Sequence, residues 1–159
     1  MNEEQKRLVD DCNNELTKIE LWIKENPTHS NVAFLVSYAV IKTSGTIELI
    51  FKQIIYDYLS RGARNETQKY LSTMIIDSSC NPSTGAIEKM LESVDGNLKV
   101  QFHNALEDQE KTDLNALVTL RNDIAHGRTN NPTIGIVIRY FAAGEKVLNK
   151  LFSSLNPVE

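Results

Sequence analysis

The stretch LNALVTLRNDIAHG, residues 114–127, decides the expected fold, because it joins a helical hydrophobic pattern to a chemically distinctive end. Leu114 and Leu117 share one helical face with Arg121, so the cation interrupts an apolar stripe. Gly127 stands where the end of a helix favours a left-handed backbone. We therefore expect a helix over Asp108–His126 that buries one face and ends in a polar cluster.

The same helical periodicity runs through the rest of the chain, and no stretch has sustained strand alternation flanked by hairpin turns. Before this segment we expect helices over Glu3–Asn26, from Ser30 or Asn31 to Ser60 or Arg61, and over Glu66–Asp77, Gly85–Val94 and Leu98–Leu106. The second of these is the longest, with Ser44-Gly45 as the place for a bend and Gly62 as its C-terminal signal. Pro132 fits the first position of a closing helix, whose buried stripe consists of Ile134, Val137, Phe141, Leu148 and Leu151. The pattern predicts an all-α bundle of about five to six helices around a long central helix.

Composition indicates one ordinary globular domain spanning residues 1–159. With 41% hydrophobic and 24% charged residues, the chain is long enough for a core and too short for two ordinary domains.

No run resembles a membrane span, and Met1–Lys6 lacks the basic and apolar regions of a secretion signal. Cys12 and Cys80 are too far apart for a metal knuckle and are interpreted as structural thiols of a reducing compartment. We expect a cytoplasmic protein that does not enter the membrane.

The net charge of −4 argues against a broad basic surface that coats nucleic acid without regard to sequence. Any contact with RNA is therefore expected to be local. Residues 121–150 hold five basic residues against two acidic ones, and Arg128 and Arg139 are the candidates for contacts with an RNA backbone. The alternative is that these cations only form a solvated helix face, which we favour for Lys146 and Lys150.

Arg121 and His126 together suit cleavage of a phosphodiester without a metal. An arginine offers a permanently charged fork of donors to phosphate oxygens, and a histidine can hold or release a proton near neutral pH. His126 shares a polar strip of its helix with Asn115 and Asn122, so it is expected to face water or a partner. In a second interpretation, His126 is simply a C-terminal helix residue.

Asp123 and His126 also have the i, i+3 spacing with which a helix can present a carboxylate and an imidazole to one metal ion. A metal site needs more ligands, and neither His29 nor His103 has a metal-ligand motif nearby. We therefore expect no metal and no cofactor, with Asp123 orienting His126 or remaining solvated.

Arg121-Asn122, followed by two residues and then Ala125-His126-Gly127, resembles the signature of HEPN-superfamily domains. In that signature an Arg, a polar residue, a short spacer and a His make up the active site of metal-independent endoribonucleases. The resemblance runs from about Ser44 to Phe152, where Ser44-Gly45-Thr46-Ile47-Glu48 looks like the family's second helix with its glutamate. The RiboL-PSP type of HEPN domain is resembled by three stretches in order: Asn81–Ile87 leading into Met90-Leu91, then Leu114–Gly127, then the closing apolar helix. The resemblance implies a HEPN-like helical bundle.

The resemblance also implies a homodimer, in which each motif meets its copy and one cleft holds two histidines and two arginines. A single histidine is not sufficient for cleavage by the RNA's own 2′-hydroxyl. That reaction requires a base for the hydroxyl proton and an acid for the leaving oxygen. His126 of the two protomers would supply these roles, and Arg121 would stabilise the charge on the phosphorane. Asn122 would hydrogen-bond the phosphate or hold the imidazole. The expected products are a 2′,3′-cyclic phosphate and a 5′-hydroxyl.

Glu48 interrupts an apolar stripe of the long helix that also contains Ile41 and Phe51. Because an unpaired charge on such a stripe is costly, as it is for Arg121, we predict that Glu48 and Arg121 meet. The pair has two interpretations that do not exclude each other. It can be a salt bridge that fixes the register of two helices, or Glu48 can orient the Arg121 fork toward a phosphate as part of the catalytic set.

Free cleavage of cellular RNA would be harmful, so the resemblance suggests a toxin or antiviral-defence effector. Its partners would then be the RNA substrate, a second copy of the chain, and a separately encoded antitoxin or regulatory protein. An alternative function belongs to another class. It is a non-catalytic HEPN-like dimer that binds a protein, nucleotide or RNA partner without cutting it.

Overall fold

The computed structural model describes residues 1–128 and 132–156, and within them the chain forms seven α-helices, one π-helical turn and no strand. In chain order the elements are α1 (Glu3–Glu25), α2 (Val32–Leu59), α3 (Asn65–Leu71), the π-turn η1 (Ser72–Ile76), α4 (Thr84–Val94), α5 (Gly96–Ala105), α6 (Asp108–Ala125) and α7 (Ile134–Leu155). The all-α expectation is confirmed. The number of helices is slightly above the expected five to six, with the short helices α4 and α5 meeting at Asp95.

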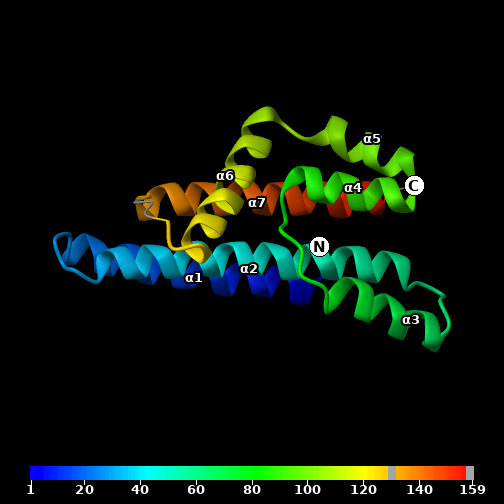
Figure 1. Ribbon diagram of the computed structural model, residues 1–159, viewed down its shortest axis with the longest axis horizontal. Helices are drawn as coiled ribbons and strands as arrows, with labels where there is room; N and C mark the ends of the chain where they lie inside the picture. The colour runs from blue at the N-terminus through cyan, green and yellow to red at the C-terminus, as the bar shows by residue number, and fades with distance from the viewer. Residues whose placement is uncertain (129–131, 157–159) are drawn as a thin grey trace.

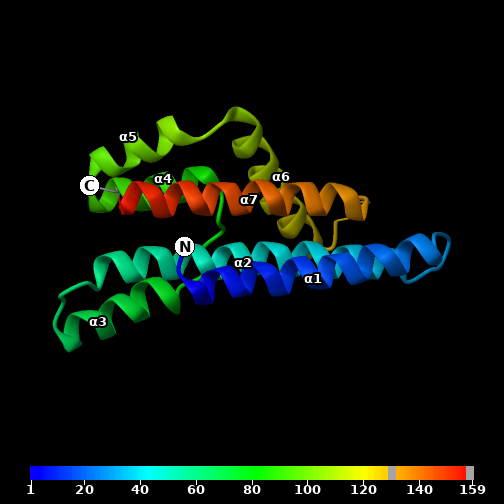
Figure 2. The same cartoon turned by 180° about the vertical axis from the view of Figure 1, so that it is seen from behind.

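The long central helix is α2, and the other helices are arranged around it. α1 packs along one side of α2, and α7 lies beside both of them. α6 and the segment 77–83 lie on the side of α2 opposite α1 (Figures 1 and 2). α6 packs on both α7 and α2, and its C-terminal end lies beside the first turns of α2. The motif of residues 121–127 is thereby placed against a helix from the other half of the sequence.

Two glycines follow helix ends in the left-handed conformation that the sequence predicts. Gly62 follows α2 with a φ of 68°, and Gly127 follows α6 with a φ of 67°. α2 continues as an α-helix through Ser44 and Gly45, the place considered for a bend. It therefore presents one continuous surface to its neighbours.

Two helix ends differ from the sequence expectation. The Thr133 side chain accepts a hydrogen bond from the N–H of Ile136, so it caps α7. Pro132 therefore precedes the cap, and its predicted place as the first residue of the helix is wrong. The expected third helix begins as α3 but ends in the wider turn η1, where the N–H of Asp77 bonds to the carbonyl of Ser72.

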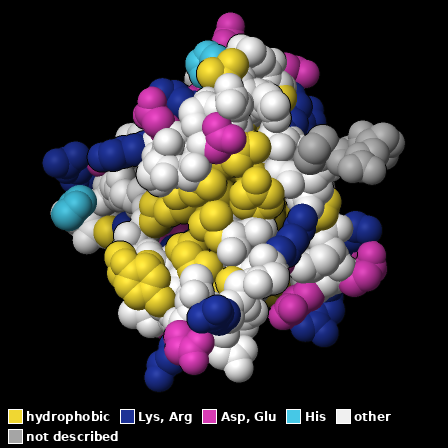
Figure 3. Space-filling model, turned by 90° about the vertical axis from the view of Figure 1, so that its right-hand side faces the viewer, with side chains coloured by type: hydrophobic (Ala, Val, Ile, Leu, Met, Phe, Trp, Pro, Cys, Tyr) yellow, Lys and Arg dark blue, Asp and Glu magenta, His cyan; other side chains and the backbone are white. Residues whose placement is uncertain are grey.

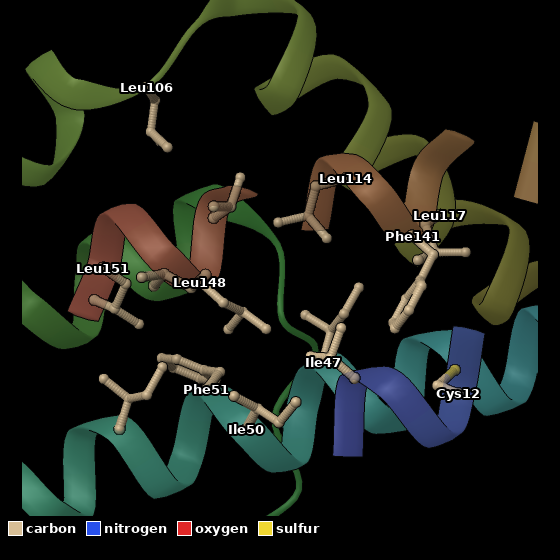
Figure 4. Packing of buried hydrophobic residues seen from close by; sticks show 14 of the residues in the cluster. Cys12, Ile47, Ile50, Phe51, Leu106, Leu114, Leu117, Phe141, Leu148 and Leu151 are labelled. Carbon is tan, nitrogen blue, oxygen red and sulfur yellow. The ribbon is translucent and has the colours of Figure 1, made fainter. Parts of the chain in front are cut away.

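The hydrophobic core lies between α2 and α7 and is closed by α1 and α6 (Figure 4). Ile50 and Phe51 of α2 lie opposite Leu148 and Leu151 of α7, and all four side chains are fully buried. Cys12 of α1 is also fully buried and has no disulfide partner. The buried thiol thus acts as a small hydrophobic side chain in the core.

α7 approaches α2 closely at Gly144. A Cβ atom at this position would collide with the side chain of Ile47 and would touch Leu114 of α6. The absence of a side chain at position 144 therefore sets how near the three helices come to one another. Gly135, on the same helix, has open space around it and plays no such part.

One face of α2 carries large hydrophobic side chains that no other described residue buries. These residues form what we call the outer stripe, and they are 40–74% exposed: Phe34, Tyr38, Ile41 and Leu49. Gly45 lies on the same face, where the absence of a side chain leaves the middle of the outer stripe without a protruding group. The sequence places Ile41 on the apolar stripe that Glu48 interrupts, and with an exposure of 44% Ile41 is not part of the core. The reason is that α1, α6 and α7 contact other faces of α2.

The expectation that no run resembles a membrane span is wrong for α2. Val32–Leu59 is long and apolar enough to cross a membrane by length and composition, and it is the only such helix in the described ranges. Half of its most apolar window is buried inside the protein. The central helix of a helical bundle has the same properties, because several of its faces are buried.

The core reaches the surface at the end of the molecule formed by the last turns of α2 and α7. Figure 3 shows hydrophobic side chains at the centre of this end and charged side chains around its rim. Tyr58 and Leu59, in the last turn of α2, are partly buried and pack against the core. This apolar end lies at the opposite end of α2 from the motif.

Substituting Gly144 tests the close approach of the helices. Gly144→Ala is expected to destabilise the fold by about 1–3 kcal/mol, because the added methyl group overpacks the contact with Ile47. Gly135→Ala is the matched control, and the higher helix propensity of alanine should stabilise the fold by up to about 1 kcal/mol. Urea unfolding of both variants measures the difference. Equal effects of the two substitutions would contradict a tight contact at Gly144.

Candidate functional site

The last turns of α6 place Arg121 and Asn122 side by side, facing the segment 77–83. The Arg121 guanidinium donates a hydrogen bond to the side-chain oxygen of Asn122 at 3.3 Å. The side-chain amide of Asn81 donates to the same oxygen, also at 3.3 Å. In the described part of the chain the guanidinium has no other hydrogen bond or ion pair, so most of its N–H groups are available to an anion.

His126 is the residue that ends α6. Its backbone N–H bonds to the carbonyls of Asn122 and Asp123, and Gly127 then turns the chain away. The side chain is exposed, as the sequence predicts, and its ring makes no hydrogen bond to residues 1–128 or 132–156. The imidazole is therefore placed where it can exchange a proton with a bound ligand.

The structure does not bring Glu48 and Arg121 together. The Glu48 carboxylate lies 2.7 Å from the Nζ of Lys52, one turn later on α2, and accepts the backbone N–H of Cys80 at 3.2 Å. Lys52 also donates to the carbonyl of Ser78. The two charged side chains are only 19% and 8% exposed, so each satisfies the other in a largely buried place. The predicted contact is corrected because an ammonium at i+4 is a nearer partner than an arginine on another helix.

The segment 78–84, which comprises most of the loop 77–83 and the first residue of α4, is bound to both α2 and α6. On the α2 side it is held by Glu48 and Lys52, as described above. On the α6 side, the backbone N–H of Thr84 donates to the side-chain oxygen of Asn115 at 3.1 Å, and Asn81 reaches Asn122. Glu48 is therefore connected to the motif through this segment and not through an ion pair with Arg121.

Sequence reasoning missed Lys52 and Asn81 as members of this cluster. The signal for Lys52 was present, because it stands four residues after Glu48 on a helix and has the opposite charge. Asn81 carried no such signal, since its contact with Asn122 joins two segments that only the tertiary fold brings together.

Of the two arginines expected to contact an RNA backbone, only Arg128 lies beside the motif. It pairs with Asp123 at 3.1 Å and is 73% exposed. Arg139 instead pairs with the buried Asp113 at 3.3 Å. Asp113 lies about 20 Å before His126 along α6, from the rise of 1.5 Å per residue. Arg139 is therefore remote from the motif and is engaged in holding α7 to α6.

The described residues near the motif form neither a metal site nor a reactive thiol. The described residues contain no group of three or more His, Cys, Asp and Glu that could hold a metal ion. Burial raises the pKa of the Cys80 thiol, and the negative charge of Glu48 raises it further. Cys80 therefore stays protonated at neutral pH and is a poor nucleophile.

The sequence was compared with models of known protein families. Residues 7–157 match the family model described as RiboL-PSP-HEPN. The chain belongs to the RiboL-PSP-HEPN family. The match includes nearly all of α1, so this HEPN domain extends further toward the N-terminus than the resemblance read from the motifs. HEPN domains are commonly ribonucleases or nucleotide-related proteins. No curated protein and no solved structure matches the chain.

In this HEPN domain, Lys52→Met is expected to loosen the segment 78–84, because methionine cannot donate to Ser78 or offset the charge of Glu48. Amide hydrogen exchange in this segment should become faster by about tenfold or more. Lys42→Met is the control, since it removes an ion pair with Glu15 in which both side chains are nearly 40% exposed, at 38% and 39%. Unchanged exchange in Lys52→Met would contradict the anchoring role of Lys52.

Proposed function

We propose that this HEPN domain is a metal-independent endoribonuclease. The observation that carries the proposal concerns two residues at the end of α6. Within residues 1–128 and 132–156, most N–H groups of Arg121 and the ring of His126 make no hydrogen bond. Arg121 is held by Asn122 and has N–H groups left for a phosphate. His126 follows five residues later, about 7.5 Å along the helix axis, and can take or give a proton.

In the proposed reaction, the 2′-hydroxyl of the RNA attacks the adjacent phosphorus as one histidine removes its proton. The bond from phosphorus to the 5′-oxygen of the next nucleotide breaks, and a second histidine gives a proton to that leaving oxygen. Arg121 stabilises the added negative charge on the phosphorane, with Asn122 beside it. The products are a 2′,3′-cyclic phosphate and a 5′-hydroxyl, so no water, metal or cofactor is consumed.

A second copy of the chain supplies the second His126 in this proposal. The outer stripe of α2 supports a homodimer, because it is a hydrophobic face that residues 1–128 and 132–156 leave uncovered: Phe34, Tyr38, Ile41 and Leu49. Its position also fits, since Phe34 lines a hollow together with Gly127 next to His126. Burying the outer stripe against its copy would bring the two motif ends toward each other across the two-fold axis.

The first test of this function is cleavage of labelled cellular RNA by the purified protein in excess chelator, with the product ends mapped. Arg121→Ala and His126→Ala are each expected to lower the cleavage rate by about 100-fold or more. Both side chains are at the surface of α6, so thermal unfolding of these variants should change little.

The matched controls are Arg7→Ala and His103→Ala, which remove an exposed arginine and an exposed histidine on α1 and α5. They should cleave at the unaltered rate. Cleavage that requires a divalent metal, or that survives both motif substitutions, would refute the proposal. Salt-dependent RNA binding without cleavage, lost in Arg121→Ala, would favour the non-catalytic alternative.

Charge placed on the outer stripe tests the dimer. Ile41→Glu is expected to convert a dimer into a monomer and to lower the cleavage rate, because each protomer would lose the histidine of its partner. Val100→Glu, on the exposed surface of α5, is the control and should leave both properties unchanged. Light scattering after size exclusion gives the mass. A monomeric Ile41→Glu variant with full activity would refute the composite site.

Unrestrained cleavage of cellular RNA would damage the cell that makes the enzyme. The proposal therefore includes a role as a toxin or antiviral-defence effector that a separately encoded protein holds in check. Arg128, exposed beside the motif, is the proposed additional contact to the RNA backbone.

A further inference from the structure

The side-chain oxygen of Asn122 accepts two hydrogen bonds, one from Arg121 and one from Asn81, each at 3.3 Å. An amide oxygen has two lone pairs, so this arrangement uses both of them. The N–H groups of the Asn122 side chain make no hydrogen bond to any residue that the structure describes, so they can donate to a ligand. Asn81 thus influences both the orientation of Asn122 and the placement of the guanidinium that Asn122 holds.

Asn81 belongs to no helix, and its position depends on the residues around it. The preceding residue, Cys80, donates its N–H to Glu48, and the following residue, Pro82, is buried. The carbonyl of Asn81 accepts the N–H of Ser83 at 2.9 Å, which makes a tight turn just before α4. The backbone on both sides of Asn81 is therefore fixed by contacts that its own side chain does not make.

These anchors matter because Asn81 itself is exposed to solvent. A hydrogen bond between exposed amides competes with water and contributes only about 0.5–1.5 kcal/mol. On an unrestrained segment, the entropy lost on ordering Asn81 would offset most of this gain. The buried pair of Glu48 and Lys52 lowers this entropy cost, because it already orders the segment that carries Asn81.

We propose that Asn81 is a positioning residue that holds Asn122, and through it Arg121, in the orientation needed at the phosphate. The Glu48–Lys52 pair serves the same end by fixing the segment that carries Asn81. This inference rests on the proposed ribonuclease function. It gives Glu48 a role in the site that requires no contact with Arg121.

The test is a double-mutant cycle on RNA cleavage with Asn81→Ala, Asn122→Ala and the double variant. Asn81→Ala is expected to lower kcat by about tenfold, the equivalent of one hydrogen bond to a neutral group, with a smaller change in KM. Because Asn81 acts through Asn122, the double variant should be no slower than Asn122→Ala alone. Asn14→Ala, on the exposed surface of α1, is the control and should cleave at the unaltered rate.

Thermal unfolding separates positioning from a purely structural role. The melting temperature of Asn81→Ala should stay close to that of the unaltered protein, since the segment keeps its anchors at Glu48, Lys52 and Asn115. Losses of kcat that multiply in the double variant would overturn the inference, as would full activity of Asn81→Ala. Either result would leave the ribonuclease function standing. Failure of the unaltered protein to cleave any RNA would refute the function itself, and with it this role of Asn81.

Discussion

The close packing of α7 on α2 at Gly144 and Ile47 determines where the other parts of the molecule lie. With no side chain at position 144, the two helices approach until Ile47 fills the space between them, and Leu114 of α6 meets the same contact. α6 is thereby held against both α2 and α7. Because α6 is one continuous helix of eighteen residues, fixing its packing also fixes the position of its C-terminal end, where Arg121 and the cap residue His126 lie.

The polar cluster beside the motif is built on this rigid base. A largely buried ion pair on α2 orders the segment 78–84, which then contacts the motif helix through side-chain amides. Buried ion pairs contribute little net stability, because the cost of desolvation offsets most of the attraction. The specific value of Glu48 and Lys52 is geometric, because together they hold the N–H of Cys80 and the carbonyl of Ser78 in the part of this segment that lies outside any helix.

The chain belongs to the RiboL-PSP-HEPN family, and its candidate site lies at the end of α6. The motif combines an arginine whose orientation is held by neighbouring amides with a histidine that is open to solvent. Alongside it runs a hydrophobic face of α2 that the described residues leave uncovered. In the proposed enzyme, the side-chain amides of Asn81 and Asn122 orient Arg121 toward the phosphate within one protomer. Dimerisation through the outer stripe of α2 supplies the second histidine.

The sequence by itself determined the helices and the place of the motif. Hydrophobic spacing, capping residues and the two left-handed glycines act over a few residues, so the ends of α2 and α6 could be predicted from neighbouring positions. The exposure of His126 followed in the same way from the polar strip on which it lies. The end of α3 in a π-turn and the cap of α7 at Thr133 were missed, because several local arrangements have similar free energies there.

Only the tertiary structure decided which charged and polar groups meet. Periodicity placed Glu48 and Arg121 on interrupted stripes of two helices, but it could not tell whether a charge is satisfied across the helix pair or along its own helix. Lys52 satisfied Glu48 locally, and Asn81 arrived at Asn122 from a segment with no periodic pattern. Such contacts depend on the relative placement of distant segments, which is set by the packing of the whole core and not by any short stretch of residues.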